Sequence, residues 1–218
     1  MSIFQEKIDR FWEKTQELYD PIQKKYNGLA YYVFQAPPSE NPKLMIIGLN
    51  PGGNDSDIKM LQQEGNAYTE MKAEWFETLR KVFDYPNNPE LKEILDKCVG
   101  TNRFFFNTGS QSGLEKIKAE VVSNGVKFAN ASGDLLNELV DIIKPEYIIA
   151  AHSDTFNHIG KYNKQTFNGK TMIGYTKPEG GIPVLKIINF SKRMRDKHYN
   201  TEEEVKAWTK TIIEFLNM

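Results

Sequence analysis

Short apolar runs alternate with amphipathic segments along this chain, and the pattern predicts four buried strands separated by helices. The strands are expected at Leu44–Leu49, Arg103–Asn107, Tyr147–Ala151 and Val184–Ile188. Apolar runs of this length, bounded by turn residues, are typical of strands that are buried on both faces. Strands that alternate with helices favour right-handed crossovers and a parallel sheet. The sequence therefore predicts an α/β fold, a three-layer α/β/α sandwich with a central four-stranded parallel sheet.

The helices are predicted from apolar residues that recur every three or four positions. One amphipathic helix is expected from about Ile3 to Tyr19, ending before Pro21. A second is expected from Met71 to Phe83, and a short one from Pro89 to Cys98, with the proline in its first turn. These helices supply the outer layers of the predicted sandwich.

Two further helices carry end signals. Ser132 precedes a periodic apolar segment that stops before Pro145, and we interpret this serine as an N-cap. The last helix begins at a capping signal, Thr201, and runs to Phe215. No repeat, low-complexity segment or long linker divides the chain, so we expect one domain over residues 1–218, with the N-terminal helix packed on it.

Composition narrows the classes of partner. The chain has 218 residues, 39% hydrophobic and 26% charged, as expected for a globular protein with one sizeable core. Its formal net charge of −1 gives no global attraction to nucleic acid, so any anion binding requires a local basic patch. A single cysteine, Cys98, excludes an intrachain disulfide and any cluster held by several thiolates of this chain.

Signals for cofactors and for membranes are missing from the sequence. No phosphate-binding P-loop or dinucleotide glycine motif follows the first strand, and no glutamate or cysteine stands at metal spacing from His152. We therefore expect no cofactor and no metal. The N-terminal residues do not resemble a secretory signal, and no apolar run approaches the ~20 residues of a membrane span. A cytoplasmic protein without a membrane partner is expected.

A polar side chain closes each predicted strand: Asn50, Asn107, His152 and Asn189. The carboxyl ends of parallel strands meet at one edge of a sheet, and ligands bind there. This edge is the candidate site. Asparagine is also an ordinary turn residue, and a histidine at a strand end is often hydrogen-bonded scaffolding, so the structural interpretation of each residue stays open.

The motifs around these residues resemble those of the uracil-DNA glycosylase superfamily. The segment Gly48-Leu49-Asn50-Pro51-Gly52 is similar to the first motif of its mismatch-specific, thymine-DNA and single-strand-selective branches. Phe104-Phe105-Phe106-Asn107 resembles the motif of the second strand, and Ile187-Ile188-Asn189-Phe190-Ser191 stands where the last motif, commonly His-Pro-Ser or Asn-Pro-Ser, would fall. The resemblance covers roughly Lys43 to Lys197, and the iron–sulfur branches are excluded because their four cysteines are absent.

The resemblance implies a monomeric base-excision glycosylase that hydrolyses the N-glycosidic bond of uracil or a related pyrimidine in single- or double-stranded DNA. Asn50 would position the attacking water, although an amide cannot accept its proton. Asn107 would complement O4 and N3–H of uracil, whereas cytosine presents the opposite pair and leaves groups unpaired at ~1–3 kcal/mol each. Asn189 would donate to the base. The substrate-binding residues predicted at this edge are Gly48, Leu49, Pro51, Gly52, Tyr68, Asn107 and His152.

Two parts of the predicted site differ from the family. Gly52 stands where another branch places a tyrosine against the pyrimidine C5, so that side of the site is expected to be open. Tyr68 is the nearest candidate for an aromatic ring that stacks on the base, and its alternative interpretation is a core residue. Phe190 replaces the usual proline of the last motif. The basic run that follows is predicted to bind DNA, with Met194 or Arg193 wedged into the base stack and the other cations on phosphates, or to be a solvated helix start. Its residues are Ser191, Lys192, Arg193, Met194 and Arg195.

A second interpretation of the same residues is a non-catalytic or repurposed relative that binds a nucleobase, nucleotide or DNA without cutting it. The near-neutral charge and the altered last motif favour this alternative. A third is an α/β protein whose resemblance to the family is coincidental.

Overall fold

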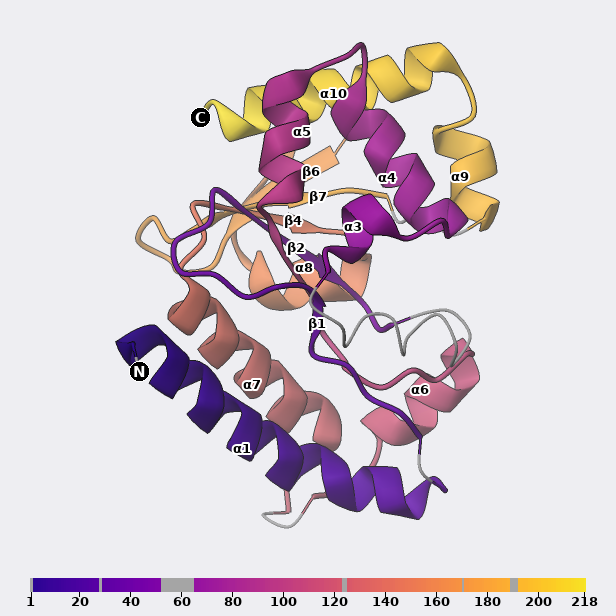
Figure 1. The fold of residues 1–218 in the computed structure, drawn as a ribbon. Coiled ribbons are helices and arrows are strands. Elements are labelled where there is room, and N and C mark those ends of the chain that lie inside the picture. Colours follow the sequence, from indigo (N-terminus) through magenta and orange to yellow (C-terminus); the bar gives the residue numbers. More distant parts are fainter. Residues whose placement is uncertain (1, 28, 52–64, 123–124, 170, 189–191) are drawn as a thin grey trace.

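Helices cover both faces of a central sheet in the computed structural model of this protein (Figure 1). The structure describes residues 2–27, 29–51, 65–122, 125–169, 171–188 and 192–218. Within these ranges the sheet has seven strands in the order β1-β3-β2-β4-β7-β6-β5. The strands are β1 Phe34–Ala36, β2 Leu44–Gly48, β3 Val99–Asn102, β4 Tyr147–Ala150, β5 Tyr162–Phe167, β6 Thr171–Tyr175 and β7 Pro183–Lys186.

The middle of the sheet is parallel and its margins are antiparallel. β2 pairs in parallel with β3 and β4, and β4 pairs in parallel with β7. β1, β6 and β5 join in antiparallel fashion. The predicted α/β class is confirmed as a mostly parallel central sheet flanked by helices. Because the chain passes from β2 to β3 on one side and later to β4 on the other, the strand order reverses between β2 and β4, the position at which such sheets bind ligands.

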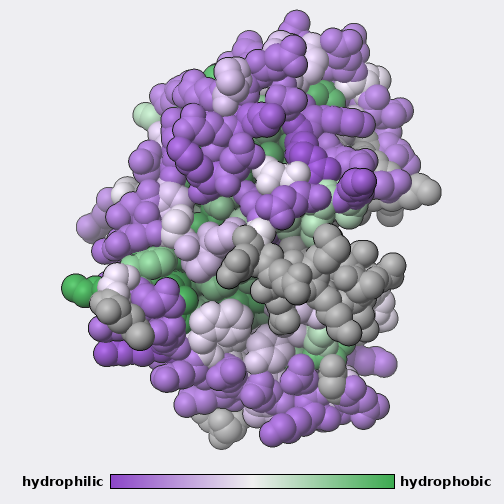
Figure 2. Space-filling model, viewed as in Figure 1, coloured by the Kyte–Doolittle hydropathy of each residue, from purple (hydrophilic) through white to green (hydrophobic). Residues whose placement is uncertain are grey.

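Two groups of helices pack on the two faces of the sheet. One face carries α1 Ile3–Lys25, α6 Gln111–Lys118, α7 Phe128–Ile143 and α8 Ser153–Ile159. The other carries α3 Ala67–Glu70, α4 Glu74–Asp84, α5 Pro89–Asp96 and α10 Glu202–Leu216. We call these the α7 face and the α4 face. α9, Lys192–His198, leads into α10. The outward surfaces of the helices visible in Figure 2 are mostly hydrophilic.

The sequence of β2 is a continuous apolar run because both faces of this strand are buried. Met45 and Ile47 belong to the core of the α7 face, and Leu44 and Ile46 to the core of the α4 face. All four side chains are completely buried. Successive side chains of a strand point to opposite faces, so a strand that is covered on both sides has no polar position.

The second predicted strand is wrong. β3 is Val99–Asn102, and the aromatic residues Phe104–Phe106 follow it as an irregular segment buried in the core of the α7 face. This segment bonds to an earlier loop: the Tyr32 N–H donates to the Phe105 carbonyl at 2.8 Å, and the Asn107 N–H to the Ala30 carbonyl at 2.9 Å. The apolar aromatic run therefore indicates a buried segment and not a strand. Periodicity alone does not distinguish a buried irregular segment from a buried strand.

β1, β5 and β6 were not predicted. β1 has three residues, too few to show a period. β5 exposes its four central side chains at the margin of the sheet, so it lacks the apolar alternation of a half-buried strand. Both margins depend on pairing with a neighbouring strand.

Several helix predictions are confirmed. α4, α5 and α10 lie within a few residues of the expected ranges, Pro89 occupies the first turn of α5, and α10 opens with a capping box between Thr201 and Glu204. α7 ends at Ile143, as Pro145 predicts. None of the helices that the structure describes has the length and apolar composition needed to cross a bilayer.

Two helix boundaries differ from expectation. α1 continues through Pro21 to Lys25, because Tyr19 and Ile22 on either side of the proline are buried in the core; an interior proline removes an intrahelical hydrogen bond, and this burial opposes that loss. α7 begins at Phe128, so Ser132 is a buried interior residue and its assignment as N-cap is wrong.

Candidate functional site at the carboxyl edge of the sheet

The carboxyl ends of β2, β3, β4 and β7 meet at one edge of the sheet. The hydrogen-bond ladder continues just beyond the strands: the Arg103 N–H donates to the Gly48 carbonyl at 3.0 Å, and the Phe104 N–H to the Leu49 carbonyl at 2.8 Å. On the other side of β2 the Ala151 N–H donates to the Ile47 carbonyl at 2.9 Å. Side chains at this edge are therefore held by a regular backbone.

Asn102, the last residue of β3, is the buried amide at this edge. It is 2% exposed and lies in register with Gly48 of β2. A Cβ at position 48 would lie 2.3 Å from Asn102 Oδ1, so the glycine makes room for the amide. Asn102 Nδ2 is buried and has no hydrogen-bond partner among the described residues. An unpaired buried donor costs ~1–3 kcal/mol, which an acceptor supplied by a ligand would recover.

Asn102, and not Asn107, is therefore the amide that ends the second parallel strand. Asn107 is 7% exposed and lies five residues beyond the end of β3, in the segment that bonds to Ala30. Sequence reasoning missed Asn102 because the aromatic run that follows it is the stronger apolar signal. The alternative signal was Val99-Gly100-Thr101-Asn102, a short segment that contains two β-branched residues and ends in an amide.

Asn50 lies two residues beyond β2 and is half-buried. Its Nδ2 donates to the Pro51 carbonyl at 3.2 Å and to Thr108 Oγ1 at 3.3 Å. Oδ1 accepts no hydrogen bond from the part of the chain that the structure describes. These contacts fix the amide and leave its oxygen to act as an acceptor. Of the neighbouring predicted residues, Leu49 packs against the core of the α7 face, Pro51 is buried, and Gly52 lies outside the described ranges.

His152 caps the start of α8. Its Nδ1 accepts the Asp154 N–H at 3.1 Å, so the neutral ring carries its proton on Nε2. Burial lowers the pKa of His152; Lys118, Arg103 and Lys186 lower it further, and Asp154 opposes them. The histidine is therefore a neutral N–H donor at this edge.

A buried chain of hydrogen bonds holds the segment that follows β3. The Phe105 N–H donates to the Tyr19 hydroxyl at 3.2 Å, Tyr19 donates to Ser132 at 2.7 Å, and Ser132 donates to the Arg103 carbonyl at 3.0 Å. Burial raises the pKa of Tyr19, so the phenol stays protonated. α1 and α7 thus position the backbone on which the edge residues depend.

Tyr68 takes the core role. It is completely buried beside Gly100, and its hydroxyl donates to Gln35 Oε1 at 3.0 Å. Burial raises its pKa well above the usual value. The ring has no exposed face on which a base could stack, so the structure gives no support to its predicted stacking role.

The last motif is described only at its borders. Asn189, Phe190 and Ser191 lie outside the described residues, as do the side chains of Lys192, Arg193 and Arg195 in α9. Met194 is half-buried. Before the gap, the Ile188 carbonyl accepts the Tyr199 hydroxyl at 2.7 Å, which ties the end of β7 to the segment after α9.

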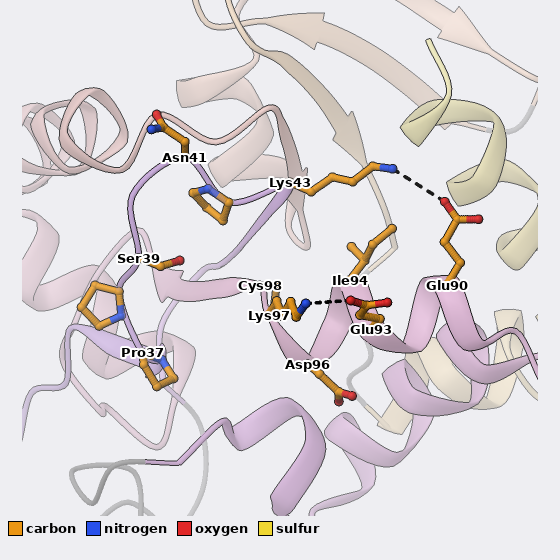
Figure 3. Close-up of a pocket in the computed structure, with 12 residues that line it drawn as sticks. Pro37, Ser39, Asn41, Lys43, Glu90, Glu93, Ile94, Asp96, Lys97 and Cys98 are labelled. Carbon is orange, nitrogen blue, oxygen red and sulfur yellow. Dashed lines mark hydrogen bonds and ion pairs between the residues drawn. The ribbon is translucent and has the colours of Figure 1, made fainter.

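A cavity of about 680 Å³ lies at the opposite end of the strands, between the loop before β2 and α5 (Figure 3). Four of its five charged side chains form two ion pairs: Lys43 lies 3.8 Å from Glu90, and Lys97 lies 2.6 Å from Glu93. The fifth is Asp96. The cavity shares no residue with the carboxyl edge. Across the described ranges, no three histidine, cysteine or acidic side chains gather closely enough to hold a metal ion.

No protein-family model matches this chain, and no curated protein matches it. The function has to be inferred from the residues at the carboxyl edge.

Proposed function

We propose that this protein is a monofunctional DNA glycosylase that hydrolyses the N-glycosidic bond of uracil or a related pyrimidine. The observation that carries the proposal is the buried amide of Asn102, whose Nδ2 lacks a partner in the described structure. Asn102 is in register with Gly48, two residues before Asn50, at the same carboxyl edge where the strand order reverses between β2 and β4. The proposal includes a three-layer α/β/α sandwich around a four-stranded parallel core, and a monomer that acts on DNA in the cytoplasm.

Asn102 reads the base in this proposal. Its Nδ2 donates to O4 of uracil, and its Oδ1 accepts from N3–H. Cytosine offers a donor and an acceptor in the reverse order, so both amide groups of Asn102 would be left unpaired, at ~1–3 kcal/mol each. Gly48 supports this role because any larger residue would displace the amide.

Asn50 orients the attacking water through Oδ1, since Thr108 and the Pro51 carbonyl occupy its Nδ2. The water oxygen bonds to the anomeric carbon, the carbon–nitrogen bond to the base breaks, and the base leaves with the bonding electrons. The departing base takes up the proton that the water releases. N–H donors stabilise the base anion as it forms, which is the role proposed for Asn102 Nδ2 and for Asn189.

A second candidate is binding of a nucleobase, nucleotide or DNA without cleavage. One observation favours it: Asp154, the carboxylate nearest to His152 in sequence, is held by Lys118 at 3.4 Å and is not placed as a free base. Amides and cations at this edge can bind a nucleobase, nucleotide or DNA without cleaving a bond in it.

The two candidates separate in a glycosylase assay. Purified protein should release uracil from single- or double-stranded oligonucleotides, and Asn50→Ala should lower the rate by about 100-fold, the cost of losing one well-placed polar group. Asn137→Ala, a half-buried asparagine of α7, is the matched control and should keep the wild-type rate. Binding without release would favour the second candidate, and a folded protein that neither binds nor releases would exclude both.

A further inference from the structure

A group of cations projects from the carboxyl edge on the face opposite Asn102. Ile47 and Ala150 are in register and point into the core of the α7 face. Arg103 and His152 lie two residues beyond this level. The hydrogen-bond ladder continues to Arg103 and to Ala151, and His152 keeps an extended backbone, so both side chains share that face. Lys186 is in register with Ala150 and joins them.

Arg103 is a half-buried cation that forms no direct ion pair with a described residue, although the Asp154 carboxylate is close enough to stabilise its charge. Its Nη1 donates to the Asp154 carbonyl at 2.7 Å, a neutral acceptor, and its Nε is buried without a partner in the described structure. The guanidinium also lies 5.1 Å from the centre of the Phe104 ring. Burial lowers the pKa of Arg103. An anion bound at this position would offset the free-energy cost of desolvating the guanidinium charge.

The neighbouring lysines differ in how far they are neutralised. Lys118 is shared by two carboxylates, Glu115 at 2.7 Å and Asp154 at 3.4 Å. Lys186 forms no ion pair within the described ranges. Arg103 and Lys186 are therefore the cations of this edge that have no direct ion pair in the described structure.

His152 lies between these charges and adds a third donor. Its Nδ1 is occupied by the Asp154 N–H, and its Nε2–H has no acceptor in the described part of the chain. Because the ring is neutral, it offers a hydrogen bond without adding to the repulsion between the cations.

We propose that Arg103, His152 and Lys186 form a phosphate-binding subsite for the nucleic-acid backbone, at the same carboxyl edge as Asn102 but on the opposite face of the sheet. The guanidinium presents paired donors that match phosphate oxygens, and the lysine acts as a point charge. The choice of a nucleic-acid phosphate rests on the proposed function, whereas the three residues that bind it are assigned independently of catalysis. The same chemistry would accept a free phosphate or a mononucleotide, which the test separates.

The test measures binding of a fluorescent single-stranded oligonucleotide that lacks uracil, by anisotropy at several salt concentrations. Each lost phosphate contact should reduce the slope of log affinity against log salt by about 0.7. The double variant Arg103→Gln/Lys186→Gln should lose about 1.4 in slope and about 25-fold in affinity at 0.1 M salt. Arg103→Lys keeps the charge and should keep the slope.

Arg80→Gln is the matched control. Arg80 is also half-buried, its Nη1 also donates to a backbone carbonyl, that of Tyr68 at 2.9 Å, and it lies on the α4 face. Its slope should equal that of the wild type. Unchanged slopes in Arg103→Gln and Lys186→Gln, or an equal loss in Arg80→Gln, would overturn the proposal. If Arg103→Gln does not fold, Lys186→Gln decides, because its side chain is only partly buried.

Two further measurements separate the ligand sources and the two proposals. Displacement of the oligonucleotide by millimolar inorganic phosphate would assign the subsite to free phosphate, and absence of oligonucleotide binding by the wild type would also overturn the nucleic-acid assignment. Uracil release is assayed separately. Slopes that fall in a protein that releases no uracil refute the proposed function alone, and uracil release with unchanged slopes refutes this inference alone.

Discussion

Gly48→Ala tests the close approach of β2 and β3 at the candidate site. The added Cβ would lie 2.3 Å from Asn102 Oδ1 and 3.4 Å from its Cγ. Carbon and oxygen atoms in contact need about 1 Å more than the shorter distance. Because Asn102 is 2% exposed, its amide has little space to move into, and overpacking of this kind costs ~1–3 kcal/mol. The displaced amide should also lose discrimination between uracil and cytosine.

A double-mutant cycle isolates this contact. Asn102→Ala removes the clashing atoms together with the unpaired Nδ2, so its own effect on the free energy of unfolding should stay within about 1 kcal/mol. In that background Gly48→Ala should be neutral or stabilising by about 0.5 kcal/mol, because alanine restricts the unfolded chain. We therefore expect the two changes to be non-additive by about 2 kcal/mol.

Urea unfolding of the four proteins, followed by tryptophan fluorescence, measures the cycle. The dependence of the unfolding free energy on urea should be the same in all four, so that the midpoints report stability alone. Additivity within about 0.5 kcal/mol would refute the close approach of Gly48 and Asn102. Uracil release provides the second readout: all three variants lack a correctly placed amide and should discriminate poorly, including the double variant whose stability is restored.

The other predictions concern the hydrogen-bond chain and the histidines. Tyr19→Phe leaves the Phe105 N–H buried without its acceptor and should destabilise the protein by ~1–3 kcal/mol. Tyr26→Phe, at a residue that is only partly buried, should cost less than about 0.5 kcal/mol in the same urea titration. Equal effects would contradict the buried chain of hydrogen bonds. Burial lowers the pKa of both His152 and His158, so the unfolded chain binds protons first as the pH falls. Their stabilising contribution should be complete above the unfolded pKa of about 6.5 and should decline as the pH falls towards the folded pKa values. Urea midpoints between pH 7.5 and about 5 measure this decline, and His158→Gln should reduce it; a decline of the same size in that variant would show that other groups cause it.

Elements with purely local signals were predictable. β2 is a continuous apolar run because helices cover both its faces, and the pattern is readable without knowing which helices they are. The start of α10 depends on Thr201 and Glu204, three residues apart, which complete a capping box between themselves. Asn50 was found for the same reason, since it directly follows a strong strand signal.

Elements that depend on distant partners were not predictable. Phe104–Phe106 have strand-like composition, yet α1 and α7 bury them as an irregular segment, and Tyr19 supplies an acceptor 86 residues away from Phe105. β5 is a strand because β6 pairs with it, although its central side chains are exposed. Such pairing energies exceed local preferences and leave little trace in the sequence around the element.

An α/β chain with polar groups at strand ends could be established from the sequence alone. Short stretches of sequence are enough for this, because apolar runs indicate buried strands and turn residues indicate where they end. Which of these groups lie on the same face of the edge depends on register between strands far apart in the chain. The register of β2 with β3 places Asn102 opposite Gly48, so Asn102 is the edge amide and Asn107 is not. The pairing of Ala150 with Lys186 brings that lysine to the face of Arg103 and His152. Side-chain direction alternates with every residue, so one position of register decides which chemistry meets at the edge.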